Sequence, residues 1–247
     1  PTHTHTTDNT TYLPTSPLDA FQAGAVVDVP IMLGTVANES NLFINFAFTK
    51  PLGELEYYVS LGLILGLNNT AKITPKYPLP SPVPSDLRPA MSAIGTDALF
   101  GCPTRNATAS VATTPGRVSP IYLYYYAHVE SFNPAIWGTV YPFNACWPIV
   151  CHASDLIELF QPQYPQYGTN YTAAEVSMST AIQWYWTNFA ATGVPGAGNP
   201  ATPLTWPAYN VSSRSVLYLQ AGATSIVPDW DGAMCNFWDS EIGYDFY

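Results

Sequence analysis

One stretch of this 247-residue chain, Asn144–Phe160, constrains its fold most, because it joins a cysteine-bracketed loop to a predicted helix. Cys146 and Cys151 enclose four residues, and His152 follows directly. Ser154 is a typical N-cap residue, and apolar side chains recur after it at helical spacing. His152 is therefore predicted on the turn into a helix. A histidine placed there can transfer protons near neutral pH, or it can serve only in packing.

The composition restricts the partners of the chain. Hydrophobic residues make up 47% of the sequence, enough for a sizeable core, whereas charged residues make up only 10%. With seven Lys and Arg residues and a net charge of −10, no basic patch for nucleic acid can form. The longest apolar run, Tyr57–Leu67, is too short for a transmembrane segment and contains two glycines.

Several features indicate an oxidising, extracellular compartment. The cysteine count is even, lysine is scarce, and Asn-x-Ser/Thr sequons occur at six positions. The first residues are neither basic nor apolar, so we expect a mature secreted protein whose signal sequence lies elsewhere. The sequons that we predict as glycosylation candidates are Asn9, Asn68, Asn106, Asn170 and Asn210.

The chain is predicted to form part of one domain over residues 1–247, because no repeat and no change in composition marks a boundary. Residues 1–20 are rich in Thr, Pro and Asn and lack periodicity, which predicts an extended surface segment. His3 and His5 have no further ligand nearby in sequence, so we predict no metal site. No cofactor is expected.

Glu39 follows a predicted buried strand, Val29–Gly34. Folds of the α/β class place their chemistry just past the carboxyl ends of such strands. A glutamate at a helix start is also favoured by the helix dipole, so the position alone leaves both readings open.

Further elements follow from residue type and periodicity. Gly101–Pro103 is predicted to separate two helices, and a capping box at Thr172–Glu175 opens another that Gly193 ends. The remaining predicted elements are helices at 52–67, 86–100 and 105–113 and strands at 118–127 and 215–220.

Five segments, taken in order, resemble type-B carboxylesterases, the cholinesterase-like branch of the α/β-hydrolase fold. The resemblance runs from about Leu13 to Trp238. It implies the C-terminal half of an α/β-hydrolase, with a central, mostly parallel sheet flanked by helices and completed by an N-terminal half. The five segments are Pro30–Phe43, Asp97–Pro103, Pro120–Tyr124 with His128, Cys151–Phe160, and Trp186–Gly193 followed by Trp206–Pro207.

The resemblance implies a Ser-His-Glu triad for ester hydrolysis, with Glu39 as the acid and His152 as the base. The required G-x-S-x-G nucleophile motif is absent from this sequence, and Ser92 lacks both flanking glycines. We therefore expect the serine on a separate N-terminal half, released from the same precursor by cleavage, although a fragment would look the same. The chain departs from the family pattern at Ser40, Ala153 and Asp155, where the family has Gly, Gly and Glu.

The neighbours of the triad residues are assigned roles by the same resemblance. Leu42 and Phe43 follow the acid by one turn and are candidates for the substrate pocket, although packing would explain them equally well. Asp155 is expected to support the site rather than carry protons, and His128 to be structural. Asn38 is predicted to be unglycosylated, since a glycan beside the acid would block the site.

The four cysteines allow three pairings. Cys146 and Cys151 bracket a short loop and are expected to pair, which would fix the loop that presents His152. The resemblance supports a second disulfide between Cys102 and Cys235. The resulting hypothesis is a secreted serine ester hydrolase that acts on a small-molecule or lipid ester. The alternative is a related binding or adhesion domain that has lost catalysis.

Overall fold

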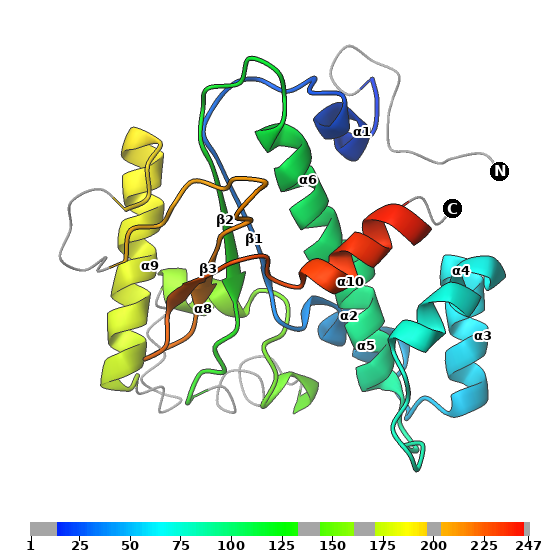
Figure 1. Cartoon of the computed structure of the whole chain (residues 1–247). Helices are drawn as coiled ribbons and strands as arrows, with labels where there is room; N and C mark the ends of the chain where they lie inside the picture. Colours follow the sequence, from blue (N-terminus) through cyan, green and yellow to red (C-terminus); the bar gives the residue numbers. More distant parts are fainter. Residues whose placement is uncertain (1–13, 133–143, 161–170, 197–203, 245–247) are drawn as a thin grey trace.

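The structure is a computed structural model that describes residues 14–132, 144–160, 171–196 and 204–244 (Figure 1). His3, His5, Asn9 and Asn170 lie outside these residues. The predicted extended segment at 1–20 is wrong at its end, where helix α1 (Pro17–Gln22) begins. Ser16 caps this helix by accepting a hydrogen bond from the Asp19 N–H, and Pro17 occupies the first turn, where its missing N–H is tolerated.

Four strands form the sheet, in the spatial order β1-β2-β3-β4. β1 pairs with β2 and β2 with β3 in parallel, while β4 is antiparallel to β3. This is the α/β class with the mostly parallel sheet that the sequence predicts. The strands are β1 (Ile31–Val36), β2 (Ile121–Tyr126), β3 (Val216–Leu219) and β4 (Ser225–Val227).

The helices fall into two groups. Those that cover the sheet or carry the site are α2 (Glu39–Ala47), α6 (Cys102–Ala112), α8 (Ser154–Phe160), α9 (Ala173–Thr192) and α10 (Gly232–Phe237). Those that extend the molecule beyond the sheet are α3 (Glu54–Leu65), α4 (Leu67–Ile73) and α5 (Arg88–Thr96), with the short turns η1 (Thr74–Lys76), η4 (Asn144–Cys146) and η6 (Trp238–Ile242).

Alternation along β2 gives the sheet two buried faces. Tyr122 and Tyr126 belong to the apolar cluster that α9 covers, whereas Ile121 and Leu123 belong to the cluster that contains Val111 of α6. Successive side chains of a strand point to opposite faces, so this run of aromatic and aliphatic residues contributes to both layers. Figure 1 shows α9 on one side of the strands and α6 on the other.

Gly34 allows one of these tyrosines to cross the sheet. Tyr124 lies opposite Gly34 in the register of β1 and β2, and a Cβ atom at Gly34 would collide with the Tyr124 ring. The ring therefore lies over β1, and its hydroxyl reaches Asp155 of α8.

Gly101–Pro103 does not separate two helices, contrary to the sequence prediction. The helix continues from α5 through the π-helical turn η2 (Asp97–Gly101) into α6. The Cys102 N–H donates to the Asp97 carbonyl, five residues back, and Pro103 lies in the first turn of α6. The wider turn accommodates a proline that an α-helix interior would exclude.

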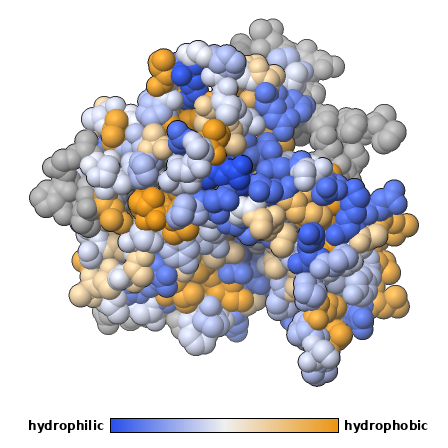
Figure 2. Space-filling model, in the orientation of Figure 1, coloured by the Kyte–Doolittle hydropathy of each residue, from blue (hydrophilic) through white to orange (hydrophobic). Residues whose placement is uncertain are grey.

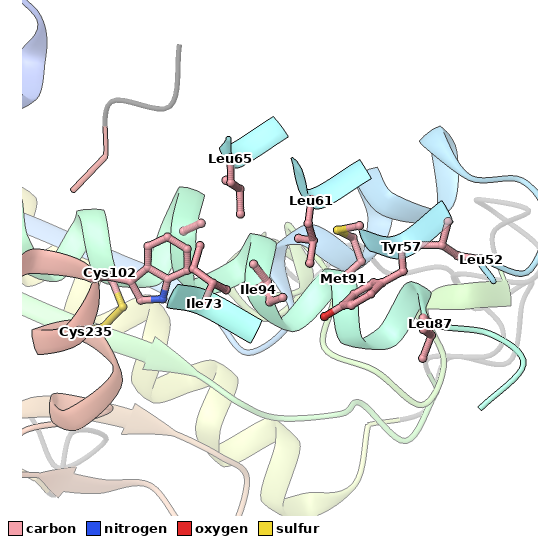
Figure 3. Packing of buried hydrophobic residues seen from close by; sticks show 12 residues of the cluster. Leu52, Tyr57, Leu61, Leu65, Ile73, Leu87, Met91, Ile94, Cys102 and Cys235 are labelled. Atoms are coloured by element: carbon pink, nitrogen blue, oxygen red, sulfur yellow. A yellow bond between two sulfur atoms is a disulfide. The ribbon is translucent and has the colours of Figure 1, made fainter. Parts of the chain in front are cut away.

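A third apolar cluster holds α3, α4 and α5 together, away from the sheet. Figure 3 shows Leu61 and Leu65 of α3 pointing toward α5, which carries Met91 and Ile94. The Cys102–Cys235 disulfide, which the resemblance implied, joins the sheet-covering helices α6 and α10 at the edge of this cluster. Among the helices in the described parts of the chain, none is both long and apolar enough to cross a membrane.

Candidate active site

Glu39 lies three residues past the end of β1 and is the first residue of α2. Its Oε1 accepts hydrogen bonds from the Thr35 hydroxyl at 3.0 Å and from the Val36 N–H at 2.8 Å. The residue is only 6% exposed. A buried carboxylate needs such donors, and here the end of the strand supplies them.

His152 lies on a loop that is attached to the same strand end. The Asn38 N–H donates to the Val150 carbonyl at 2.9 Å, and Asn38 and Cys151 form an isolated parallel bridge. Ala153 then adopts a left-handed conformation with φ of 70°, and α8 begins at Ser154. The predicted turn into a helix is therefore correct, but Ser154 is its first residue rather than its cap.

The structure brings Glu39 and His152 together although 113 residues separate them. His152 Nδ1 lies 2.5 Å from Glu39 Oε2, so the carboxylate accepts the Nδ1–H hydrogen bond. The His152 side chain is 43% exposed while that of Glu39 is 7% exposed. The buried acid thus orients a ring whose other nitrogen, Nε2, remains available for proton transfer.

The disulfide loop is anchored to α2. Cys146 and Cys151 form the predicted disulfide, and the Asn41 amide of α2 donates to the Ala145 carbonyl at 2.7 Å. Leu42 packs against this disulfide. It therefore supports the loop and does not line the cavity that Phe43 borders.

Two phenylalanines flank the imidazole. The ring centroid of Phe43 lies 5.1 Å from that of His152, and the centroid of Phe100, in η2, lies 5.6 Å away. The two phenylalanine rings stack on each other at 5.9 Å. Phe100 was not among the predicted site residues, although it lies in one of the five resembling segments.

Asp155 lies behind the site rather than in it. Tyr124 donates a hydrogen bond to its Oδ2 at 2.9 Å. Burial raises the pKa of Asp155 above its usual range, an effect that the Tyr124 hydrogen bond partly offsets. Its contact with Tyr124 fixes α8 against the sheet, which agrees with a supporting role.

His128 contacts a different carboxylate. Its Nε2 lies 3.1 Å from Oε1 of Glu175, the residue that completes the capping box of α9. Burial raises the pKa of Glu175, but hydrogen bonds from Ser131 and Thr172 outweigh this and lower it to about 2. His128 thus joins a helix cap to the end of β2, as its predicted structural role requires.

The described residues offer one group with three metal-binding atoms close together, formed by Cys102, Asp231 and Cys235. Both sulfur atoms belong to the disulfide, so neither can act as a thiolate ligand. This group does not fit a metal ion.

The sequons differ in accessibility. Asn68 and Asn210 are exposed, and the Asn210 side chain accepts a hydrogen bond from the Ser212 N–H. Asn106 lies within α6, and its amide nitrogen donates to Asp239 at 3.0 Å, which is unfavourable for glycan attachment. Asn38 lies directly before Glu39, within the bridge between the two loops.

The nucleophile is the component that this arrangement lacks. In the described parts of the chain, no serine hydroxyl forms a hydrogen bond to His152. Ser92 lies buried within α5, far from the strand-to-helix turn that an exposed nucleophile requires. The pair can therefore accept and return a proton, but it needs an acceptor of the substrate from elsewhere.

A sequence model described as "Carboxylesterase family" matches residues 3–238. The chain belongs to the carboxylesterase family. It is similar to the cAMP-regulated D2 protein of Dictyostelium discoideum, with 35% identity over 84% of this chain and 36% of that protein. It is also similar to bile salt-activated lipase of Homo sapiens, with 23% identity over 92% of this chain and 30% of the lipase.

Solved structures of family members share the fold. A structure named PNB esterase matches with a TM-score of 0.65 and 23% identity, and the match covers 91% of this chain and 41% of that one. The α/β-hydrolase class is thereby confirmed for the part present here. The chain spans about a third of the length of the two curated relatives.

Thr35 is a site residue that the sequence analysis missed. Its hydroxyl donates to Glu39 Oε1 from the last turn of the strand, four residues earlier in the chain. A hydroxyl side chain near the end of a strand, followed by an acid, was the available signal, but the same pattern is common in strands without function.

Proposed function

We propose that this carboxylesterase-family chain supplies the acid and the base of a Ser-His-Glu triad in a secreted serine ester hydrolase. The reaction is hydrolysis of a carboxylic ester. Glu39 and His152 lie in this chain, and the serine lies in an N-terminal part of the protein, carried on a separate chain. The observation that carries the proposal is the buried Glu39 carboxylate hydrogen-bonded to Nδ1 of a half-exposed His152.

The proton transfers follow from this geometry. His152 Nε2 takes the proton of the serine hydroxyl as its oxygen attacks the carbonyl carbon of the ester. The imidazolium then gives that proton to the leaving alkoxide oxygen, and the acyl group stays on the serine. Water, activated in the same way, releases the acid and restores the serine. Glu39 stabilises the imidazolium and keeps Nδ1 protonated throughout.

The open edge of the sheet supports the proposed partner. β1 pairs with β2 on one side, and no strand of the described residues pairs with its other side. Unpaired backbone groups on an edge strand are a template for another strand. A strand of the N-terminal part would continue the sheet beside the strand that leads into Glu39.

The two disulfides support the proposed compartment. Both lie fully buried, and the described cysteines include no free thiol. Disulfides form and persist in oxidising compartments, which fits a secreted protein.

A fluorophosphonate probe tests the function directly. We expect intact-mass analysis of the native protein, labelled and then reduced and denatured, to show the probe on a serine-bearing polypeptide that accompanies this chain. A His152→Ala variant is the control and should abolish labelling. An accompanying polypeptide that takes no probe in the wild type would favour a binding or adhesion domain. A folded, monomeric 247-residue species alone would contradict the two-part enzyme.

A further inference from the structure

An apolar cavity of about 320 Å³ lies beside His152, between α2, α3 and α5. Figure 3 shows part of its wall, where Leu61 and Leu65 of α3 point toward Ile94 of α5. Ile64 of α3 borders the cavity from its half-exposed side. The cavity therefore reaches from the catalytic loop to a helix that the mechanism does not otherwise use.

The cavity begins at the ring that transfers protons. Phe43 and Phe100 line it, and both rings lie within 6 Å of the His152 ring centroid, at 5.1 and 5.6 Å. Phe43 is partly exposed, so this end is not sealed by the described residues. A group in the cavity would continue directly from an ester bond placed at His152.

The lining selects for apolar groups. Ser40 is its one hydroxyl-bearing side chain, and no charged residue lines it. A charged or polyhydroxylated group would lose its hydration there without gaining partners. Cavities of 300 Å³ and above are in the range of ligand sites.

The volume indicates the size of the group. An apolar cavity of about 150 Å³ holds a benzene molecule. A cavity of about 320 Å³ therefore has room for roughly twelve carbon atoms. Such a cavity is larger than an acetyl group requires.

We propose, on the basis of the ester hydrolase function proposed above, that this cavity binds an unbranched aliphatic chain of the substrate. Ile64 and Leu65 of α3 set the length that fits. The substrates are then esters with a medium-length to long aliphatic chain. That chain can belong to the acyl part or to the alcohol part, because the cavity recognises only its apolar surface.

Two ester series distinguish these sources in the complete protein that contains this chain and its nucleophile. One is p-nitrophenyl esters with acyl chains of increasing length, and the other is n-alkyl acetates, both below their micellar concentrations. We expect kcat/KM to rise about threefold per added methylene in one series, as transfer of a methylene from water to an apolar site predicts. The series that shows the rise identifies which part of the ester occupies the cavity.

The outcomes separate the two proposals. Hydrolysis of p-nitrophenyl acetate with no dependence on chain length in either series would overturn the aliphatic site and leave the esterase function standing. Hydrolysis of no ester, together with no labelling by the fluorophosphonate probe, would contradict the esterase function. In that case binding of decanoate to the same protein, measured by calorimetry, still tests the cavity.

Neighbouring residues on α3 provide a matched pair of variants. Ile64→Trp places a large ring at the cavity, whereas Leu63→Trp places the same ring at an adjacent position that is 82% exposed and does not line the cavity. We expect Ile64→Trp to lower the ratio of kcat/KM for the ten-carbon ester to that for the two-carbon ester by about tenfold or more. Leu63→Trp should keep this ratio, and the decanoate affinity, within about twofold of the wild type.

Decanoate binding gives a readout that needs no catalysis. We expect its Kd to rise at least about tenfold in Ile64→Trp alone, with circular dichroism showing both variants folded. Equal effects of the two variants on the ester ratio or on Kd, or no decanoate binding by the folded wild type, would overturn the proposal.

Discussion

Glu39 and Glu158 are both buried glutamates near α8, yet their surroundings differ. Glu39 receives hydrogen bonds from Thr35, Val36 and His152. Glu158 is 0% exposed, and neither of its carboxylate oxygens has a hydrogen-bond partner among the described residues. Burial alone therefore does not identify a functional acid in this molecule; the donors and the paired histidine do.

The electrostatics of Glu158 follow from this difference. Burial raises its pKa to about 8, and the nearby carboxylates of Glu130 and Glu175 raise it further, while the Ser179 hydroxyl offsets part of the effect. Burial also raises the pKa of Glu130 to about 7, although Tyr126 donates a hydrogen bond to it at 2.7 Å. This side of α8 thus holds carboxyl groups that stay protonated at neutral pH.

The largest expected effect comes from breaking the first environment. Glu39→Gln keeps the size of the side chain but leaves the imidazolium without a charged partner. We expect kcat for ester hydrolysis to fall about 10⁴-fold, as replacing the acid of such a triad does. The Tm of the variant should stay within a few degrees of the wild type. Activity within tenfold of the wild type would show that Glu39 is not the acid.

The second environment is tested by Glu158→Gln. The folded-state pKa of Glu158 lies above its value in the unfolded chain, so the folded state binds the extra proton between about pH 4.5 and 8. The free energy of unfolding should therefore decrease as pH rises through this window, by up to about 1.4 kcal/mol per pH unit. The variant removes that group, so its stability relative to the wild type should rise by roughly 2 kcal/mol or more between pH 5 and pH 8.

Chemical denaturation at pH 5, 6.5 and 8 measures this change. Glu56→Gln, at an exposed position of α3, is the matched control and should not alter the pH dependence. Parallel stability curves for the wild type and Glu158→Gln would contradict the assignment of a protonated, buried Glu158.

A smaller effect is expected from Thr35→Val, which sharpens the comparison by removing one donor to Glu39. The Val36 N–H and His152 remain, so the carboxylate loses orientation rather than its charge. A single hydrogen bond to a charged group contributes about 1.5–3 kcal/mol, and part of this is recovered by the remaining donors. We expect kcat to fall about tenfold with KM changed less than twofold. Thr35→Ser should restore most of kcat, whereas loss in both variants would indicate a packing role.

The smallest effect concerns the backbone between the two environments. Ala153 holds a left-handed conformation that glycine adopts without strain. A left-handed residue with a Cβ costs about 1–2 kcal/mol, and glycine's greater freedom in the unfolded chain offsets part of the gain. We expect Ala153→Gly to raise the free energy of unfolding by less than about 1 kcal/mol. A decrease, measured by denaturation, would show that the Cβ makes contacts worth more than the strain.

The sequence predicted the site better than the fold around it. The strand before Glu39, the turn before α8 and both disulfides follow from local patterns and from the resemblance. The direct pairing of Glu39 with His152 depends on a backbone bridge between Asn38 and Cys151, which no local pattern reveals. The role of Phe100 is long-range in the same sense.

The continuous helix from α5 to α6 shows the opposite failure. Glycine and proline together predict a break, and the local propensities are sound. The break does not occur because a π-helical turn absorbs the proline, and because the buried cluster and the Cys102–Cys235 disulfide hold both halves of the helix in place. Tertiary packing overrides local preference there.

That π-helical turn also has a consequence for how such chains change over time. It holds one residue more than an α-helical turn, so removing one residue from Asp97–Gly101 would leave the helix intact while rotating everything beyond it by about 100°. Cys102 would then face away from Cys235, and Phe100 away from His152. In this family member a single codon lost from a helix would separate a crosslink and an aromatic wall at once, whereas one lost from a surface loop would disturb neither.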